Sequence, residues 1–513
     1  MINFTPLVRS RFLSRLQEHV RYIDYADAVQ QGELVWLIEH AALTTMGRRY
    51  DFSTVRTYRE FAARVPLHTY EDLRPMVMRM VRGEADVLWP GRTRWYAQSS
   101  GTSGGRSKYI PITDEALNRN HYQGASDVVS HYLNLNEASR IFAGKALILG
   151  GSFASTLEVP QGVHVGDLSA TLIQRINPLA GRFRVPHKSI ALMADWKEKL
   201  PALVNAAIKE DVTNLSGVPS WFLTVLREVL RVTGASSIHE VWPHLEVFFH
   251  GGIAFGPYRA QYEQLCDMSR MHFLETYNAS EGFFATQSDW STTAMLLLLD
   301  VGVFYEFIPI ADCDSDSPRV LPAWEVEAGK TYELVITACN GLWRYRIGDT
   351  VTIEQTHPIK IKIAGRTRSF INAFGEELMV HNADAAIAAT EQRTGLRVRD
   401  YTAAPVYAEG GHRGRHQWVI EFDGEVTDAS RFAEILDEQL CAVNSDYAAK
   451  RAGNIFLDPL EIIIARPGLF DAYLSQNGGR LGGQRKVPRL CNDRHIIEGV
   501  LGVTRVELKR VPR

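Results

Sequence analysis

The feature that most constrains the fold is a change in hydrophobic periodicity along the chain. After Trp95, short apolar runs alternate with patterns of helical spacing. The runs KALILGG and EVFFHGG predict buried strands with glycines at their C-terminal ends, and residues 190–210 and 220–234 predict helices. Within the first of these helices, Pro201 is expected either to kink the helix or to open a second one. The alternation favours an α/β layer architecture, in which ligands gather at the C-terminal ends of strands.

The second half of the chain has two further patterns. From Val301 the apolar residues recur at every second position, which predicts antiparallel strands at residues 301–307, 332–337, 350–354 and 359–364. After Arg366, helices and strands alternate again. The helices are expected at 380–395 and 428–443, and the strands at 416–422 and 459–465.

A length of 513 residues is too much for a single core and predicts two or three domains, and the patterns above divide the chain into two. The first hundred residues are expected to be helical at 8–23 and 33–47, with Gly47 as the cap of the second helix. We predict a large α/β N-terminal domain, with β-sheets flanked by helices, at 1–366. A hinge at 367–370 and a small, mobile α+β domain at 371–513 would complete the chain.

Composition excludes several classes of protein. The net charge of −3 gives no bulk electrostatic reason to expect nucleic acid or an anionic membrane as a partner. The five cysteines are far apart and form no C-x-x-C, so neither a disulfide framework nor a zinc site is expected. The N-terminal twenty residues carry charges where a signal peptide needs an apolar core, and the apolar run Ala294–Leu299 is too short to span a bilayer. The expected location is the cytoplasm, and no obligate protein partner is inferred.

Residues 98–113, QSSGTSGGRSKYIPIT, combine many small residues with a lysine, Lys108. A flexible surface turn is disfavoured because the stretch lies between two strand-like pieces. A Walker A loop fails because Arg106 occupies the position of its second glycine. The G-x-S-x-G pattern at 101–105 would have to enter an apolar helix, which Pro111 opposes. A phosphate cradle, made of backbone N–H groups, hydroxyls and Lys108, uses every feature of the stretch.

Six stretches, in order along the chain from Ser99 to Arg489, resemble motifs of the GH3 acyl-acid amido synthetases, a branch of the adenylate-forming superfamily. They are SSGTSGGRSKYIP (99–111), FFHGGIAFGPY (248–258), LETYNASEGF (274–283), WRYRIGDT (343–350), IKIAGRTRSFINAFGEE (361–377) and GGQRKVPR (482–489). The resemblance implies the adenylate-forming fold, with a large N-terminal domain that binds ATP and the acid.

The resemblance also implies residue roles. Glu281 is a hard oxygen ligand suited to Mg²⁺ that bridges phosphates, and Tyr277 offers a flat face to adenine. Asp349 would accept hydrogen bonds from the ribose, and Lys486 would meet the α-phosphate. The implied nucleotide-binding residues are Ser99, Ser100, Gly101, Thr102, Ser103, Lys108, Gly251, Gly252, Tyr277, Ser280, Glu281, Asp349 and Arg366; the implied catalytic residues are Lys108, Glu281 and Lys486.

Structural interpretations of single residues stay open at this point. Glu281 could cap a turn, Asp349 could be a turn residue after glycine, and Lys486 could be a solvated loop lysine. The implied function is an ATP- and Mg²⁺-dependent ligase that activates a small carboxylic acid as acyl-AMP and transfers the acyl group to an amino acid or other amine. The alternatives are an acyl-CoA ligase with the same first step, and a nucleotide-binding regulator without turnover.

Overall fold

The computed structural model describes most of the chain, and its contacts divide the chain into two compact units. The described residues are 3–99, 108–155, 157–252, 255–313, 315–366, 370–371, 376, 378–406, 414–426, 428–444, 447–448, 451, 457–476, 487–491 and 494–503. The N-terminal unit comprises Met1–Ile347 and Val351–Lys362, and the C-terminal unit comprises Gly348–Thr350 and Ile363–Arg513. The hinge at 367–370 stays a prediction, since 367–369 lie outside the described residues.

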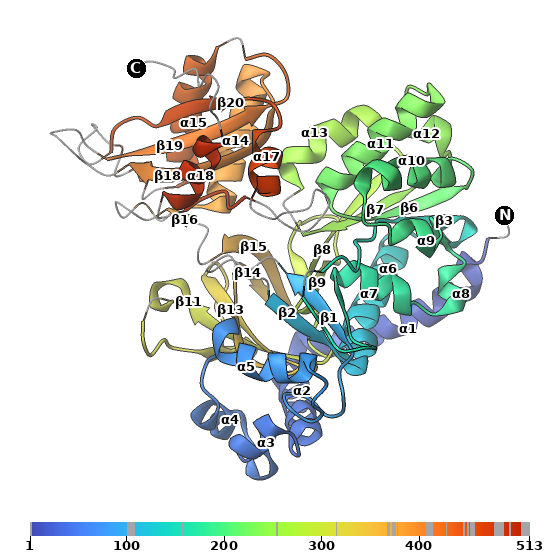
Figure 1. The fold of residues 1–513 in the computed structure, drawn as a ribbon, viewed down its shortest axis with the longest axis vertical. Helices are drawn as coiled ribbons and strands as arrows, with labels where there is room; N and C mark the ends of the chain where they lie inside the picture. The colour runs from blue at the N-terminus through green and yellow to red at the C-terminus, as the bar shows by residue number, and fades with distance from the viewer. Residues whose placement is uncertain are drawn as a thin grey trace. The chain divides into compact units, whose positions relative to one another are not determined.

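Most of a twelve-stranded sheet lies in the N-terminal unit, and five neighbouring strands of it are parallel (Figure 1). Their spatial order is β5-β3-β6-β7-β8. This is the α/β region that the alternation of strands and helices predicts. The bounds are β3 (Lys145–Ile148), β5 (Arg184–Val185), β6 (Val212–Gly217), β7 (Val247–Gly251) and β8 (His272–Ala279).

The remaining strands continue the same sheet in the order β9-β10-β15-β14-β13-β11-β12. Antiparallel pairing joins β8 to β9, β9 to β10, β10 to β15, and β11 to both β12 and β13. The period-two prediction is confirmed, but the sequence did not indicate that these strands extend the parallel ones. Their bounds are β9 (Gly282–Gln287), β10 (Met295–Leu297), β11 (Val303–Pro309), β12 (Leu321–Pro322), β13 (Thr331–Ala338), β14 (Leu342–Thr356) and β15 (Ile359–Arg366).

Helices cover both faces of the parallel strands (Figure 1). One face packs against α10–α13 in a core that includes Phe222, Trp242 and Phe248. The opposite face carries a second core, which includes Tyr132 of α6 and Phe249. Phe248 and Phe249 enter opposite cores because successive side chains of a strand alternate between its faces. The bounds are α6 (Gln123–Leu135), α10 (Trp196–Ala207), α11 (Pro219–Thr233), α12 (Ile238–Val241) and α13 (Gly256–Leu265).

The helix predicted at 190–210 is divided, although not by its proline. The chain forms α9 (Lys188–Ala191) and then α10, and Pro201 lies inside α10. Asp195 opens α10, because its side chain accepts a hydrogen bond from the backbone N–H of Lys197 at 2.8 Å. The two short helices before this break are α7 (Leu168–Arg175) and α8 (Pro178–Gly181).

The N-terminal helices confirm the helical pattern and correct one detail. The predicted helix at 33–47 ends at Ala41, and Gly47 lies inside the next helix instead of capping this one. A Cβ on Gly47 would lie 2.1 Å from the carbonyl oxygen of Ala41, so glycine permits the close turn between the helices. No described helix is long and apolar enough to cross a membrane. The bounds are α1 (Thr5–Asp24), α2 (Ala26–Ala41), α3 (Thr45–Arg49), α4 (Tyr58–Arg64) and α5 (Tyr70–Val81).

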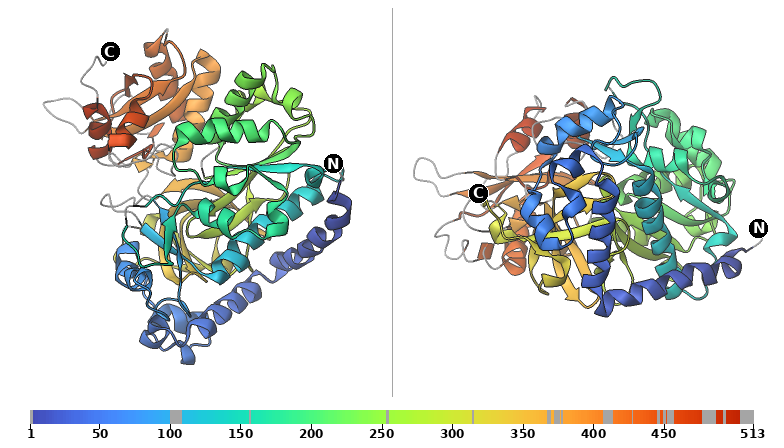
Figure 2. Two further views of the ribbon diagram at one scale, coloured as in Figure 1. Left: turned by 45° about the vertical axis from the view of Figure 1, so that its right-hand side comes forward. Right: turned by 90° about the horizontal axis from the view of Figure 1, so that it is seen from below.

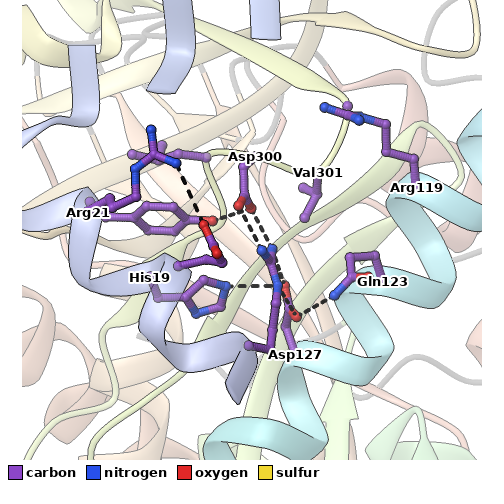
Figure 3. Close-up of polar contacts among 12 residues, drawn as sticks. His19, Arg21, Arg119, Gln123, Asp127, Asp300 and Val301 are labelled. Carbon is purple, nitrogen blue, oxygen red and sulfur yellow. Dashed lines mark hydrogen bonds and ion pairs between the residues drawn. The ribbon is translucent and has the colours of Figure 1, made fainter. Parts of the chain in front are cut away.

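Helix α1 runs along one side of the unit (Figure 2), and charged side chains that are mostly buried fasten it there (Figure 3). Arg15 donates to Asp127 of α6 from Nε at 2.9 Å and to Asp300 from Nη1 at 2.7 Å. Tyr22 also donates to Asp300, which lies between β10 and β11. His19 joins the group through its Nε2 atom, 3.4 Å from Oδ2 of Asp127, while its Nδ1 atom lies 3.0 Å from Nε2 of His131. This cluster ties helices from the chain start to the central sheet.

The C-terminal unit confirms the predicted α+β pattern and adds further elements to it, among them a strand of its main sheet. Its sheet has the order β18-β19-β20, with β18 and β19 antiparallel and β19 and β20 parallel. The strand β18 had no counterpart in the sequence prediction. The bounds are β16 (Phe370–Ile371), β17 (Leu378–Met379), α14 (Val380–Thr394), β18 (Val398–Val406), β19 (Arg415–Phe422), α15 (Ala429–Val443), β20 (Glu461–Ala465), α17 (Leu469–Gln476) and α18 (His495–Gly502).

Candidate active site

The first motif connects two antiparallel strands of a separate small sheet. This sheet has the order β2-β1-β4, from β1 (Trp95–Ser99), β2 (Lys108–Ile112) and β4 (His164–Gly166). Ser99 pairs directly with Lys108. A Walker A loop and a nucleophile elbow both lead from a strand into a helix, so this strand-to-strand connection excludes them. The predicted ligands Ser100, Gly101, Thr102 and Ser103, and the side chain of Ser99, lie outside the described residues.

Lys108, at the start of β2, contacts two tyrosines. Its Nζ atom donates to the hydroxyl of Tyr345 at 3.0 Å and lies 5.7 Å from the centroid of that ring. It also lies 5.9 Å from the ring centroid of Tyr70, whose hydroxyl accepts from the backbone N–H of Tyr109 at 2.6 Å. Burial raises the pKa of Tyr70 to about 12, so this ring is a neutral phenol that favours the cation. The two rings therefore help to place the ammonium group.

The motif at residues 274–283 forms a tight hairpin between β8 and β9. Ala279 pairs with Gly282, so Ser280 and Glu281 alone make the turn. Both are buried, with 3% and 7% of their surface exposed. Tyr277 is also buried, and its ring packs edge-on against Phe284 with the centroids 5.0 Å apart. The hairpin thus places three of the predicted nucleotide ligands within five residues at the end of a parallel strand.

The glycines of the β7 motif lie next to this hairpin strand. Gly251 pairs with Thr276, and a Cβ on Gly251 would lie 2.4 Å from the Thr276 carbonyl oxygen. The close approach of β7 and β8 therefore requires glycine at 251, independently of any ligand. Gly252 has φ +79, which an L side chain rarely adopts, and the nearest atom to an added Cβ is 3.5 Å away on Val218. Of the pair, Gly252 has the more open surroundings.

The motif at residues 343–350 lies on β14. Arg346 is a structural residue, since its Nε atom donates to Glu333 at 3.1 Å and its Nη2 to the Cys313 carbonyl at 2.8 Å. Asp349 is buried and follows Gly348, whose φ is +84. It belongs to the C-terminal unit, where Thr350 Oγ1 lies 3.8 Å from the position that a Cβ on Gly365 would take. Arg366 follows as the last residue of β15, and its side chain lies outside the described part of the chain.

The segment Asn340–Tyr345 connects the motifs at 99–111, 274–283 and 343–350 within the N-terminal unit. Asn340 donates from Nδ2 to the carbonyl oxygen of Glu281 at 2.8 Å, and five residues later Tyr345 accepts from Lys108. The backbone of His68 supports the segment by pairing with Tyr345. The sequence prediction assigned no role to Asn340, Tyr345 or Tyr70. The Asn-Gly pair at 340–341 signals a hairpin turn, but a contact with a distant motif leaves no local signal.

The last motif is described only beyond its lysine, because Lys486 lies outside the described residues. The residues that follow are bound to β18. The carbonyl oxygen of Pro488 accepts from Thr402 Oγ1 at 2.7 Å, and that of Arg489 accepts from the backbone N–H of Ala403 at 2.8 Å. The Arg489 guanidinium pairs with Asp384 and lies 4.9 Å from the Tyr401 ring centroid. This end of the motif is therefore built into the core of the C-terminal unit.

The donor set at the β8–β9 turn fits Mg²⁺ that is shared with a nucleotide. Among the described residues, no group of three His, Cys, Asp or Glu side chains could hold a metal ion. Mg²⁺ is commonly bound by one or two carboxylates together with substrate phosphates and water, so a protein-only cage is not needed. Glu281 can supply such a carboxylate.

Two ionisable residues, the buried His250 and the half-buried Glu275, lie beside each other on the strands that precede this turn. His250 and Glu275 are paired across β7 and β8. Burial raises the pKa of Glu275 to about 7, against a smaller lowering effect of Lys362. Burial also lowers the pKa of His250 to about 3. The sequence prediction did not single out either group, because the shifts arise from burial between strands that are distant in sequence.

Two solved structures resemble this chain in fold. AtGH3.15 acyl acid amido synthetase, in complex with 2,4-DB, matches with a TM-score of 0.78 and 19% identity, covering 100% of this chain and 99% of that chain. A 2-hydroxyisobutyryl-CoA ligase, in the postadenylation state with 2-HIB-AMP, matches with a TM-score of 0.60 and 14% identity, covering 92% and 90%. At these identities the likeness concerns the fold, and it confirms the predicted α/β architecture.

The chain is also similar in sequence to curated plant proteins over most of its length. The probable indole-3-acetic acid-amido synthetase GH3.1 of Arabidopsis thaliana is 24% identical over 92% of this chain and 90% of its own length. The indole-3-acetic acid-amido synthetase GH3.8 of Oryza sativa subsp. indica is 24% identical over 94% and 91%. The GH3 family N-terminal domain matches residues 15–185 and 157–271, the central domain 296–366 and the C-terminal domain 381–495. The chain therefore belongs to the GH3 family.

Proposed function

We propose that this protein is an ATP-dependent, AMP-forming ligase that joins a small carboxylic acid to an amino acid or other amine through an acyl adenylate. Membership of the GH3 family supports the proposal, as do the relatives named amido synthetases. The observation that carries it is the segment Asn340–Tyr345, which contacts both Lys108 and the turn that holds Glu281. Three motifs that are distant in sequence are thereby assembled within one unit.

In the first step, a carboxylate oxygen of the acid attacks the α-phosphorus of ATP. The bond from that phosphorus to the bridging oxygen of the β-phosphate breaks, and pyrophosphate leaves. The reacting groups are all anionic, so preorganised positive charge lowers the barrier. We assign Lys108 to this task, with Lys486 at the α-phosphate. Mg²⁺ at Glu281 would neutralise phosphate charge, and holding both reactants together contributes about 7–11 kcal/mol.

In the second step, the amine nitrogen attacks the acyl carbon, and the bond from that carbon to the phosphate oxygen breaks to release AMP. The nitrogen then loses a proton. An α-amino group has an ordinary pKa near ~8, so a useful fraction is already neutral at cellular pH. We propose that the chain pivots at 367–370 between the steps, which withdraws Lys486 and admits the acceptor. Such gating motions take microseconds to milliseconds in other enzymes.

The remaining parts of the proposal concern substrates and location. We expect the helices around 115–135 and 165–180, with the apolar segment 218–226, to line the acyl pocket. The nucleotide contacts would include the first-motif loop, Gly252, Tyr277, Ser280, Asp349 and Arg366. We place the protein in the cytoplasm, because the cysteine spacing favours a reducing compartment.

Hydroxylamine trapping tests the first step. Purified protein is given ATP, Mg²⁺ and a library of small carboxylic acids, and hydroxylamine intercepts an activated acyl group as a coloured hydroxamate. We expect hydroxamate and pyrophosphate in equal amounts with at least one acid. Failure with every acid, together with the absence of nucleotide binding, would overturn the proposal. Amino acids and CoA are then compared as acceptors, and a thioester product would identify an acyl-CoA ligase instead.

A further inference from the structure

The β8–β9 hairpin needs support from outside itself. Two-residue hairpins favour turns with positive φ, because only these match the twist of the strands. Neither Ser280 nor Glu281 has a positive φ, and the register of β8 and β9 shifts between Tyr277 and Asn278. A turn of this geometry would not be kept in place by its own strands alone. The position of Glu281 therefore depends on contacts from elsewhere in the unit.

Two buried asparagines supply such contacts. Asn340 is 1% exposed, and its Nδ2 atom donates to the Glu281 carbonyl oxygen at 2.8 Å. Asn120 is 2% exposed, and it binds Phe283 at both main-chain groups. Its Oδ1 atom accepts from the Phe283 N–H at 2.7 Å, and its Nδ2 donates to the Phe283 carbonyl oxygen at 3.0 Å. Main-chain groups on both sides of Gly282 are thus held at three points.

The two asparagines come from different, well-anchored elements. Asn120 lies on a π-helical segment (Ala116–Tyr122) and also donates to the carbonyl oxygen of Val301 at 3.0 Å. Asn340 lies in the β13–β14 connection, where its Oδ1 atom accepts from the Leu342 N–H at 3.2 Å. The π-helix is an uncommon form that often occurs at functional sites. Because each asparagine also bonds to main-chain groups outside the β8–β9 turn, it fixes the turn relative to those groups.

We propose that Asn120 and Asn340 are positioning residues for Glu281, acting on the backbone of its turn so that the carboxylate is presented to a divalent cation carried by the nucleotide. The inference rests on the proposed role of Glu281 in the adenylation reaction. Groups that orient a metal ligand without touching the metal commonly contribute 10–100-fold to metal affinity. Neither asparagine touches the substrate in this scheme.

Binding of Mn²⁺ with α,β-methylene-ATP, which cannot be cleaved at the reacting bond, tests the inference without turnover. Protein-bound Mn²⁺ is detected by the enhancement of water-proton relaxation. Asn340→Ala and Asn120→Ala should each weaken Mn²⁺ binding about tenfold or more, in the same direction as Glu281→Ala. Asn340→Ser, which keeps an oxygen for the Leu342 N–H, should also weaken binding and serves if the alanine variant does not fold.

Gln30→Ala is the matched control. Gln30 is also a fully buried amide, and it donates to the carbonyl oxygens of Leu299 at 2.7 Å and Val303 at 2.9 Å, at the two ends of the β10–β11 connection instead of at the β8–β9 turn. It should lower the melting temperature while Mn²⁺ binding changes less than about twofold. Equal weakening in this control would overturn the inference, as would asparagine variants that bind Mn²⁺ like the wild type while Glu281→Ala does not. A Glu281→Ala variant that binds normally would overturn the metal role in the proposed function, and the inference with it.

Discussion

Two neighbouring turns of the central sheet are held in different ways. The β10–β11 connection (residues 298–302) is bound by charged side chains in addition to amides: Asp300 binds Arg15, and the Gly302 N–H donates to Glu33 at 3.0 Å. The β8–β9 turn receives neutral amides on its main chain, from Asn120 and Asn340. Asn120 touches both turns.

The charged side chains of the β10–β11 connection are used in contacts within the protein. In the β8–β9 turn, the Glu281 carboxylate is proposed to bind a ligand. In the β10–β11 connection, charged side chains form part of the attachment, so their ionisation serves stability. An amide that holds the main chain adds no net charge beside a turn that is to receive a cation and phosphates. We therefore expect substitutions in the first turn to change stability, and substitutions in the second to change metal and nucleotide binding.

Arg15→Ala should have the largest effect on stability. It leaves Asp127, whose side chain is fully buried, and Asp300 without their shared cation. Breaking a buried ion pair in this way typically costs about 3–5 kcal/mol of unfolding free energy. Urea unfolding measures the loss, with the exposed Arg11→Ala on the same helix as the control. If Arg15→Ala lowers the unfolding free energy no more than the control does, the comparison fails, since the charged cluster would then not stabilise the fold.

Lys486→Ala also removes a cation, but it should lower the reaction rate instead of the stability that Arg15→Ala lowers. We expect adenylate formation to slow about 10²–10³-fold, the range for removing one preorganised electrostatic group, while the melting temperature is unchanged. Aminolysis of preformed acyl-AMP should be largely retained. Single-turnover assays of each half-reaction measure this, with the exposed Lys209→Ala as the control. Equal losses in both half-reactions would remove the role assigned to Lys486.

Glu281→Ala should raise the Mg²⁺ concentration needed for half-maximal adenylation and lower the rate about 10²-fold. Its counterpart in the other turn, Asp300→Ala, should lower the melting temperature and leave the Mg²⁺ requirement unchanged. Pyrophosphate release across a Mg²⁺ titration measures both variants. An unchanged Mg²⁺ requirement in Glu281→Ala would remove the metal assignment, and a raised one in Asp300→Ala would remove the distinction between the turns.

Glu275→Gln should have the smallest effect, visible as a pH dependence. Burial raises the pKa of this carboxyl to about 7 from its ordinary 4.5, so the folded protein binds a proton that the unfolded chain has lost. The contribution of Glu275 to stability is therefore greatest below pH 4.5 and declines as the pH rises to 7. The melting temperature of Glu275→Gln, relative to wild type, should rise between these values. A difference that is constant with pH would contradict the buried state of the carboxyl.

Within each unit, sequence patterns predicted the helices and strands far better than the contacts that these elements make with one another. The period-two segments were found because strand alternation is visible in a few residues, as β11 and β13 show. The end of α2 at Ala41 was missed, because the glycine at 47 is required by a close contact with the Ala41 carbonyl oxygen and does not mark the end of a helix. The β18 strand was also missed. Its burial depends on β19 and on the docking of residues after 486, which are distant in the chain.

For the site, the motifs named Lys108 and Glu281, and the structure added the residues that place them. Tyr70 and Tyr345 around Lys108, and Asn120 and Asn340 around the β8–β9 turn, have ordinary sequence surroundings. Of the predicted ligands, Ser100 to Ser103 and Lys486 fall outside the described residues, and their roles stay predictions.

The sequence alone determined the element types and the family motifs, because periodicity and motif spelling are local properties of a chain. Only the tertiary structure decided which distant residues support the motifs. Asn120 and Phe283 are 163 positions apart, and Asn340 and Glu281 are 59 apart. They meet because antiparallel strands continue the parallel sheet, which brings the β13–β14 connection and the π-helical segment to the β8–β9 turn. No local pattern records such a meeting, since each amide would be equally compatible with many other folds.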